Sequence, residues 1–403
     1  MMVNRIAKLH FLLILLINTV NLNSQDEGVQ LPKFLQKSYF GVNVGVINHP
    51  FSQAHLEPGF TFHSLEVPPI AVRLVLFGYQ FNKSLSAQIS YMRPVAWMKY
   101  HYTVDELTFD HLLNLQVWMN YASLDLKYRL AFSKKVSAYV EASYSIVTRN
   151  GYTGWYGTVV RNAKFSTIQL GAGLNYQLNK KWDLQLSGIF SPENKKEKQP
   201  HTSFVSVGFN YRLQAYTEKQ IEKANKSVRK HPKQMIQLGF SGNSLGYGVN
   251  NALENIYLFW GGDAEVRQGF SINYQRNIFY SKRFFSMEWG TSFGWWQSEL
   301  KQESFFTLSV YPLLRFTFLR TKKADAYLFY SVAGPTFISN VVIDEIDTGG
   351  HFTFQDRMGL GIFFGENRTY NAEFRIGHYS NGNLLPRNPG IKIPLSFNLG
   401  FSF

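Results

Sequence analysis

The sequence predicts an all-β chain that forms two fused antiparallel transmembrane β-barrels of about eight strands each. Segments of about ten residues alternate between apolar and small or polar positions, which is typical of strands with one face toward lipid. Aromatic residues make up 16% of the chain and glycine occurs 31 times, which favours strands and tight turns over helices. A charged interruption near the middle separates two sets of such segments.

The last segment shows the alternation most clearly. Its apolar positions, which we expect to face the lipid, are Ile391, Ile393, Leu395, Phe397, Leu399, Phe401 and Phe403. Strands of a soluble β-sandwich also alternate, but they are usually only five or six residues long. A strand that ends on phenylalanine also resembles the terminal strand of outer-membrane barrels. Pro394 removes a backbone donor, so we expect a bulge or register defect there.

The first 24 residues are predicted to be a secretory signal peptide. Arg5 and Lys8 precede an apolar run over 11–20, and the cut is expected before Gln25. The alternative, a membrane anchor, is disfavoured because this run is shorter than the ~20 residues a spanning helix needs. Such a signal predicts export, and the strand pattern then predicts the outer membrane of a Gram-negative cell.

The predicted domains are an N-terminal barrel over 38–214, a charged linker over 215–232 and a C-terminal barrel over 233–403. The linker is rich in Lys and Glu, is compatible with a helix and carries no apolar stripe. One sixteen-stranded barrel is the rival architecture. Strands are expected near 39–47, 70–80, 85–93, 115–130, 136–148, 166–178, 181–190 and 203–213 in the first half. In the second half they are expected near 234–247, 254–260, 267–279, 284–296, 304–319, 324–335, 351–364, 369–380 and 391–403. One of the early segments of this half could instead be a loop.

The net charge of +14 and the absence of cysteine limit which partners and sites the chain can have. Without cysteine there are no disulfides, thiolate metal sites or lipid-modified N-terminal cysteine. Nucleic acid is the usual partner of so basic a chain, but an exported barrel does not meet it. The phosphates of lipopolysaccharide and the outer-membrane lipids are the expected anionic partners, and solvated loops with no specific partner are an equally good explanation.

The segment from Phe374 to Ile391 resembles the active-site region of the lipid A 3-O-deacylase (PagL-type) family. That family has His-x-Ser-Asn near the outer end of one strand, then a loop with Pro-Asn-x-Gly, then the last strand. The matching positions here are His378, Ser380, Asn381, Asn388 and Gly390. The resemblance covers the C-terminal half only. It implies an eight-stranded barrel that hydrolyses an acyl ester of lipid A without a metal or other cofactor.

The strand pattern supports this resemblance independently. Phe374, Ile376, His378 and Ser380 share one face, and the two apolar residues mark that face as the lipid side. Polar groups on such a face are costly unless they have partners or a function. We therefore expect Ser380 as nucleophile and His378 as its general base. Donors around Asn381 and Gly382 are expected to hold the oxyanion, although the family has a second glycine where this chain has Asn383.

The third catalytic residue departs from the family. The family places a glutamate at the position of Lys392, so a catalytically inactive relative is one alternative. Asp356 interrupts an apolar row on the preceding strand. If Phe364 pairs with Tyr370, antiparallel counting places Asp356 directly opposite His378, with Cβ atoms roughly 5 Å apart. Asp356 is therefore the predicted acid.

Other patterns in the chain are weaker. The Gly242–Gly246 segment fits G-x-S-x-G, but that motif works on a strand-to-helix turn of an α/β sheet. Tyr152, Trp155 and Tyr156 are predicted to be interface or loop residues. The ten histidines show no ligand spacing, so no metal site is expected. The competing function is a non-catalytic barrel pair that serves as envelope scaffold, adhesin or small porin.

Overall fold

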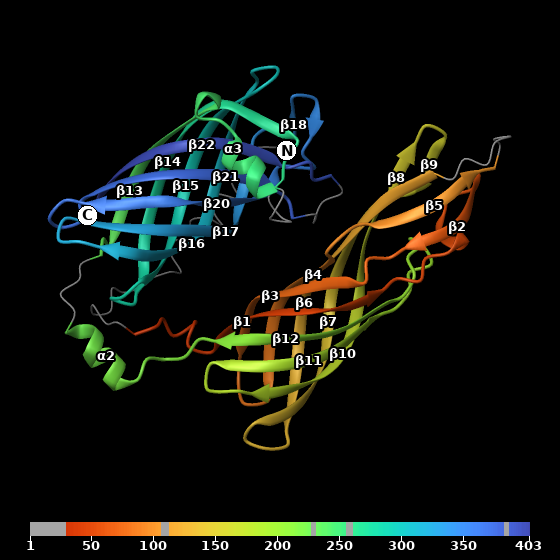
Figure 1. Ribbon diagram of the computed structural model, residues 1–403, viewed down its shortest axis with the longest axis horizontal. Coiled ribbons are helices and arrows are strands. Elements are labelled where there is room, and N and C mark those ends of the chain that lie inside the picture. Colours follow the sequence, from red (N-terminus) through yellow and green to blue (C-terminus); the bar gives the residue numbers. More distant parts are fainter. Residues whose placement is uncertain (1–29, 106–112, 227–230, 255–260, 383–386) are drawn as a thin grey trace, which may run out of the picture.

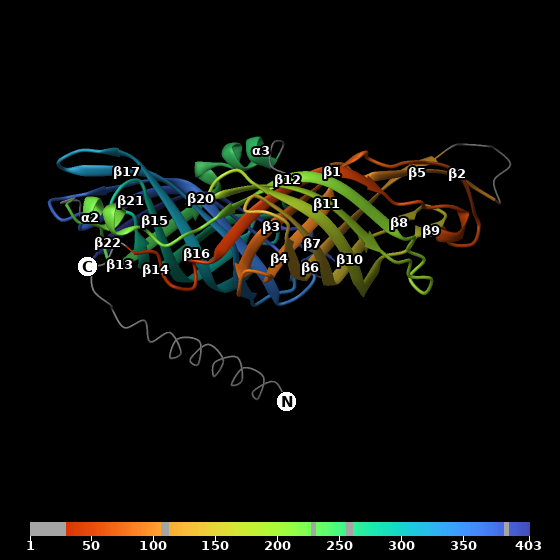
Figure 2. The ribbon, with the colours of Figure 1, turned by 90° about the horizontal axis from the view of Figure 1, so that it is seen from below.

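The computed structural model describes residues 30–105, 113–226, 231–254, 261–382 and 387–403. The predicted signal segment, 1–24, lies outside this range, as does most of the predicted strand at 254–260. Figure 1 shows two separate rings of strands with a short helix between them, and Figure 2 gives the view from below. The described helices include none that is long and apolar enough to cross a membrane.

The first ring is an eight-stranded antiparallel barrel that closes through the pairing of its first and last strands and of its two central strands. Its strands are β1 (Ser38–Asn48), β3 (Ile70–Gln80), β4 (Leu85–Pro94), β6 (Leu113–Ala131), β7 (Val136–Asn150), β10 (Ala163–Gln177), β11 (Trp182–Ser191) and β12 (Thr202–Arg212).

Additional strands extend this barrel at the end that carries its long loops. They are β2 (Phe60–Glu66), which pairs with β5 (Met98–Val104), and β5 in turn pairs with the start of β6. A small hairpin of β8 (Tyr152–Gly154) and β9 (Gly157–Val160) lies beside them. A cluster of buried apolar side chains that includes Tyr100, Met119 and Phe204 fills the space there. The sequence did not predict this extension.

Charged side chains fill the lumen of the first barrel. Arg73 pairs with Asp125 at 2.7 Å and with Glu141 at 2.8 Å, and Lys127 lies 3.5 Å from Glu141. All four are nearly fully buried. Paired charges of this kind satisfy one another inside a small barrel, whose interior is only wide enough for side chains.

The linker forms helix α2 (Glu218–Asn225), as its composition allowed. The segment before β1 and a residue just before α2 together make an apolar contact with the second barrel. Leu31 and Leu35 pack with Tyr216 against Phe279 of the second barrel, and Gln30 exchanges two hydrogen bonds with the backbone of Tyr216. The barrels are thus joined at the end where their short turns lie.

The second ring is a closed antiparallel barrel of eight strands. Its strands are β13 (Gln234–Gly242), β14 (Ala264–Tyr280), β15 (Phe285–Ser298), β16 (Ser304–Arg320), β17 (Ala324–Ile338), β20 (Phe352–Phe364), β21 (Tyr370–Ser380) and β22 (Ile391–Ser402). A small hairpin of β18 (Val342–Ile343) and β19 (Ile346–Asp347) follows β17. The prediction of two eight-stranded antiparallel barrels is confirmed, and the single sixteen-stranded ring is wrong because each ring closes on itself.

β13 is shorter than predicted, and the chain leaves the barrel wall after it. The predicted strand over 234–247 ends at Gly242, followed by a 3-10 turn η2 (Asn243–Leu245) and helix α3 (Gly248–Glu254). Beyond this point β14 pairs directly with β22 in parallel, Ala264 with Ile391, which closes the gap. Asn250 of α3 donates a hydrogen bond to the Ile393 carbonyl, so α3 is fastened beside the loop end of β22.

Candidate functional site

The hairpin of β20 and β21 brings the predicted acid and base together. Phe364 pairs with Tyr370 across the short turn, and eight residues further along each strand Asp356 pairs with His378. Both stand on the outer face of the wall, since Leu360 and Phe374, at the same strand parity, are half exposed. The pairing predicted from the turn length is therefore present.

The side chains of this pair approach each other within ion-pair range. His378 Nδ1 lies 3.7 Å from Asp356 Oδ2, which is longer than a hydrogen bond. Catalytic hydrogen bonds are often long in structures without substrate and shorten when substrate binds. Nδ1 is therefore the imidazole nitrogen that faces the carboxylate.

A β-bulge in β17 fixes Asp356 from its other side. The pairing of β17 with β20 shifts register between Ser331 and Gly334, and Ala333 within the bulge takes a left-handed φ of 48°. Its N–H donates a 2.6 Å hydrogen bond to Asp356 Oδ1. A non-glycine residue in this conformation is strained, and such strain gathers at functional sites. Ala333 was not predicted from the sequence, although the following Gly334-Pro335 is a bulge signal.

Lys392, at the position of the family's glutamate, occupies the other flank of the histidine. It pairs with His378 across β21 and β22, and its Nζ lies 3.2 Å from Glu265 Oε1 on β14. Glu265, Lys392, His378 and Asp356 thus form one outer-face row across four strands, which we call the polar row. Glu265, which the sequence analysis did not single out, balances the lysine charge beside the imidazole.

The expected defect at Pro394 is confirmed, and it changes the face of two residues. The pairing of β21 with β22 shifts register where Arg375 faces Ser396 but Gly377 faces Ile393, which leaves one extra residue on β22. Phe397 and the alternate residues after it face outward, whereas Ile391 and Ile393 are buried in the lumen core with Trp296. The prediction that all seven apolar residues of the last strand face lipid is wrong, because the bulge reverses the parity.

Ser380 is the last residue of β21 and stands two positions beyond His378. It has the same parity as His378, pairs with Phe354 of β20 and is half-buried. Two positions along a strand separate Cα atoms by about 6.6 Å, a span that a serine and a histidine side chain bridge when they lean together. His378 is only 1% exposed, so this side of the site is well covered.

The loop after Ser380 is held by Asn381 and Asn388. The N–H of Asn381 donates a 2.7 Å hydrogen bond to Asn388 Oδ1, and the side-chain amide of Asn381 donates to the carbonyls of Arg387 and Thr348. Both donor groups of Asn381 are thus used within the chain. Its predicted oxyanion role stays a prediction, and its observed role is to fasten the loop.

Two glycines of the predicted loop take conformations that other residues rarely adopt. Gly382 has a φ of 61° and Gly390 a φ of 74°. A Cβ on Gly390 would also lie 2.5 Å from the Gly261 carbonyl oxygen. Gly390 is therefore required where the loop meets the start of β14, and Gly382 shapes the turn beside Ser380.

The β18–β19 hairpin contacts both this loop and the turn between β15 and β16. Arg387 forms an ion pair with Asp347. Asp344 Oδ1 accepts a 2.7 Å hydrogen bond from Ser298 Oγ, and its two carboxylate oxygens accept the N–H groups of Lys301 and Leu300. Burial alone would raise the pKa of Asp344, but these hydrogen bonds outweigh it and lower that pKa below its usual value.

The remaining candidate motifs lie away from this site or lack its chemistry. Residues 243–245 of the G-x-S-x-G segment form the 3-10 turn η2 rather than a strand or a nucleophile elbow. Trp155 and Tyr156 stand exposed at the tip of the β8–β9 hairpin, and Tyr152 lies within it. In the described part of the chain no group of three or more His, Asp or Glu side chains is placed to hold a metal ion.

Comparison with known proteins gives two family matches. Residues 268–402 match the model of the lipid A 3-O-deacylase (PagL) family, and residues 36–212 match the outer membrane protein beta-barrel domain. Each match covers less than half of the chain, and no curated protein matches it. The resemblance of the C-terminal half to the deacylase family is therefore confirmed, and both matches place the protein in the outer membrane.

Among solved structures, the outer membrane enzyme PagL is 15% identical with a TM-score of 0.30, and the match covers 42% of this chain and 99% of that one. Neisserial surface protein A is 12% identical with a TM-score of 0.28, covering 44% and 97%. The N-terminal barrel domain of Pseudomonas aeruginosa OprF is 18% identical with a TM-score of 0.27, covering 44% and 98%. At these identities and TM-scores the solved structures add nothing to the family matches.

Proposed function

We propose that the C-terminal barrel is a lipid A 3-O-deacylase, an ester hydrolase that acts on lipopolysaccharide from the lipid-facing side of its wall. The observation that carries the proposal is the pairing of Asp356 with His378 on the outer face, two positions from Ser380. An acid, an imidazole and a hydroxyl in this order are the parts of a serine hydrolase. An ester buried in the outer leaflet meets them only on this face.

In the proposed reaction Ser380 Oγ attacks the acyl carbonyl carbon while His378 Nε2 takes the hydroxyl proton. Asp356 stabilises the imidazolium that forms. The tetrahedral intermediate then expels the sugar hydroxyl, which receives the proton from His378, and leaves an acyl ester on Ser380. Water attacks this ester by the same two proton transfers, which releases the fatty acid and restores the serine.

The oxyanion requires N–H donors beside Ser380. Since both donor groups of Asn381 are engaged in the loop, we assign this role to the main-chain N–H of Gly382. Asn388 and Gly390 act indirectly, because they fix the path of the loop that carries this N–H.

Lys392 is compatible with catalysis because of its own partner. An unpaired ammonium beside His378 would oppose the imidazolium, but the Glu265 carboxylate at 3.2 Å neutralises it. Asp356 then supplies the negative charge that the family's glutamate supplies from the other flank. The proposed acid therefore lies on β20, on one side of the histidine strand, whereas the family's glutamate position lies on β22, on the other side.

The test is mass spectrometry of lipid A from cells that express the full-length protein. We expect the wild type to remove one 3-hydroxyacyl chain, and Ser380→Ala to leave lipid A intact. Ser304→Ala is the matched control, since Ser304 is exposed at the loop end of β16 and far from the polar row in the strand order. Unmodified lipid A with well-expressed wild type would favour the non-catalytic scaffold or adhesin.

The N-terminal barrel is proposed to be a membrane partner domain with no pore. Its lumen is occupied by the Arg73, Asp125 and Glu141 ion pairs, which leaves no room for a wide channel. The small-porin alternative is therefore the weaker of the non-catalytic functions.

A further inference from the structure

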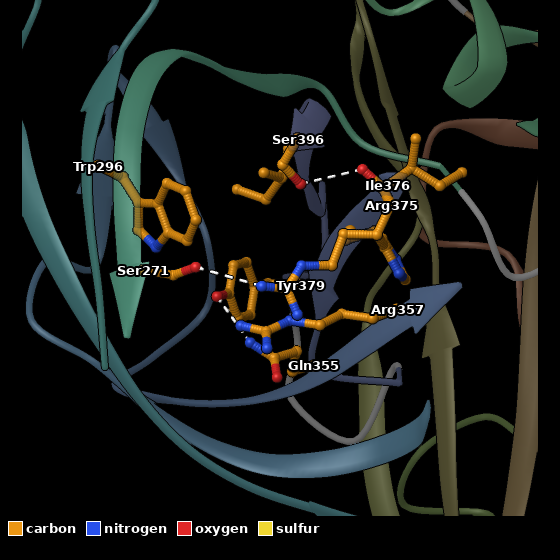
Figure 3. A pocket seen from close by; sticks show the side chains of 11 residues that line it. Ser271, Trp296, Gln355, Arg357, Arg375, Ile376, Tyr379 and Ser396 are labelled. Atoms are coloured by element: carbon orange, nitrogen blue, oxygen red, sulfur yellow. Dashed lines mark hydrogen bonds between the residues drawn. The ribbon is translucent and has the colours of Figure 1, made fainter. Parts of the chain in front are cut away.

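A small cavity of about 10 Å³ lies inside the second barrel, behind the part of the wall that carries His378. Figure 3 shows its lining, which includes Arg357, Arg375, Tyr379, Trp296 and Ser271. The two guanidinium groups lie close together in this view, and both arginines are at most 5% exposed. The cavity lies directly behind the polar row, since His378 also lines it, but Arg357, Arg375 and Tyr379 enter it from positions of inward strand parity.

The charges around this cavity are not balanced. Arg357 donates hydrogen bonds to Asn273 Oδ1 at 2.6 Å and Ser292 Oγ at 3.1 Å, which are neutral partners. In the described ranges of the chain no carboxylate lies within 4 Å of Arg357. Arg375 has Glu373 at 3.9 Å and otherwise donates to the neutral side chains of Asn398 and Ser271.

Glu373 cannot neutralise both cavity arginines, because other groups share it. Arg315 lies 3.6 Å from this carboxylate, and Tyr327 donates a 2.6 Å hydrogen bond to it. Among the described residues, the other carboxylate buried in this part of the lumen is Glu288, which is paired with Arg315 at 2.8 Å and with His231. Three guanidinium groups therefore face two carboxylates.

An arginine cannot lose its proton to escape burial, so an uncompensated guanidinium in a closed lumen needs an anion. The groups around the cavity offer N–H and O–H donors: the two guanidiniums, Ser271 Oγ and Tyr379 OH. We propose that the second barrel binds a small monovalent anion of the size of chloride between Arg357 and Arg375. None of these four ligand groups belongs to the polar row, although His378 borders the same cavity, so anion binding can be tested without the proposed hydrolysis.

The experiment measures urea unfolding of the full-length protein, refolded in detergent, as chloride replaces gluconate at constant ionic strength. Once chloride exceeds its dissociation constant, each tenfold increase should raise the folding equilibrium constant about tenfold. Arg357→Gln should abolish this dependence. Arg267→Gln, which removes an exposed arginine of β14, should retain it. A chloride response that is absent in the wild type, or equal in Arg357→Gln, overturns the proposal.

Arg357→Gln also loses hydrogen bonds to Asn273 and Ser292 and can fail to fold, so a second measurement uses the wild type alone. Crystals grown in bromide should show an anomalous peak between the guanidinium groups of Arg357 and Arg375. Electron density without an anomalous peak there contradicts the site. Neither result depends on whether lipid A is hydrolysed.

Discussion

Replacement of Asp356 by asparagine should slow hydrolysis strongly without unfolding the barrel. The substitution keeps the side-chain volume and an oxygen that accepts the Ala333 N–H, but it removes the negative charge beside the imidazole. A unit-charge pair at the observed 3.7 Å interacts by about 4.5 kcal/mol at an effective dielectric constant of about 20. This corresponds to roughly a 10³-fold loss in kcat/KM, since about 1.4 kcal/mol is tenfold in rate.

The assay is release of 3-hydroxy fatty acid from purified lipopolysaccharide by the detergent-solubilised protein, quantified by mass spectrometry. The matched control is Asp325→Asn, because Asp325 is also a buried acid of the second barrel but pairs with Arg320 and Arg368 at the turn end. We expect the control to keep near wild-type kcat/KM. If Asp356→Asn stays within threefold of the wild type, Asp356 does not serve as the acid and the relocated-acid argument is wrong.

Three further outcomes follow from the same region. Combining Asp356→Asn with Lys392→Glu and Glu265→Lys should restore at least tenfold of the lost kcat/KM, because the swapped pair returns an acid beside the imidazole; no recovery would contradict this electrostatic account. Ala333→Gly should raise the free energy of unfolding by roughly 0.5–1 kcal/mol in urea titrations, because it relieves a left-handed φ at 48°, and a lower free energy would argue against strain. Hydrogen bonds lower the folded-state pKa of Asp344, so the stabilisation that this carboxylate gives is complete above its ordinary pKa near 4 and is lost as the pH falls further. Proteolysis of the β15–β16 loop should therefore accelerate at low pH in the wild type. It should not accelerate in Asp344→Asn, whose loop is already loosened at neutral pH.

Strand periodicity was sufficient to predict both barrels and the pairing of Asp356 with His378. In a closed antiparallel barrel with short turns, the turn length fixes the register of each hairpin, so counting from Phe364 and Tyr370 places Asp356 opposite His378. Pro394 likewise predicted the bulge in β22, because proline has no N–H to donate to the neighbouring strand.

The same periodicity failed where apolar side chains occupy both faces of the wall. Ile391 and Ile393 look like lipid-facing residues, but the bulge turns them into a core inside the loop end of the barrel. Two of the groups that act on Asp356 and Lys392 also could not be predicted from the sequence. Ala333 contributes a backbone N–H, and Glu265 reaches Lys392 only because β14 pairs directly with β22 after β13 ends.

The most direct measurement of the proposed function is hydrolysis by the purified full-length protein in vesicles that contain lipid A and ¹⁸O-labelled water. Ser380 as nucleophile predicts that the wild type releases a 3-hydroxy fatty acid with ¹⁸O in its carboxylate, and that Ser380→Ala, folded to the same extent, releases none. Release by Ser380→Ala at the wild-type rate, or no release by the folded wild type, would contradict the assignment of this barrel as a serine-dependent lipid A deacylase.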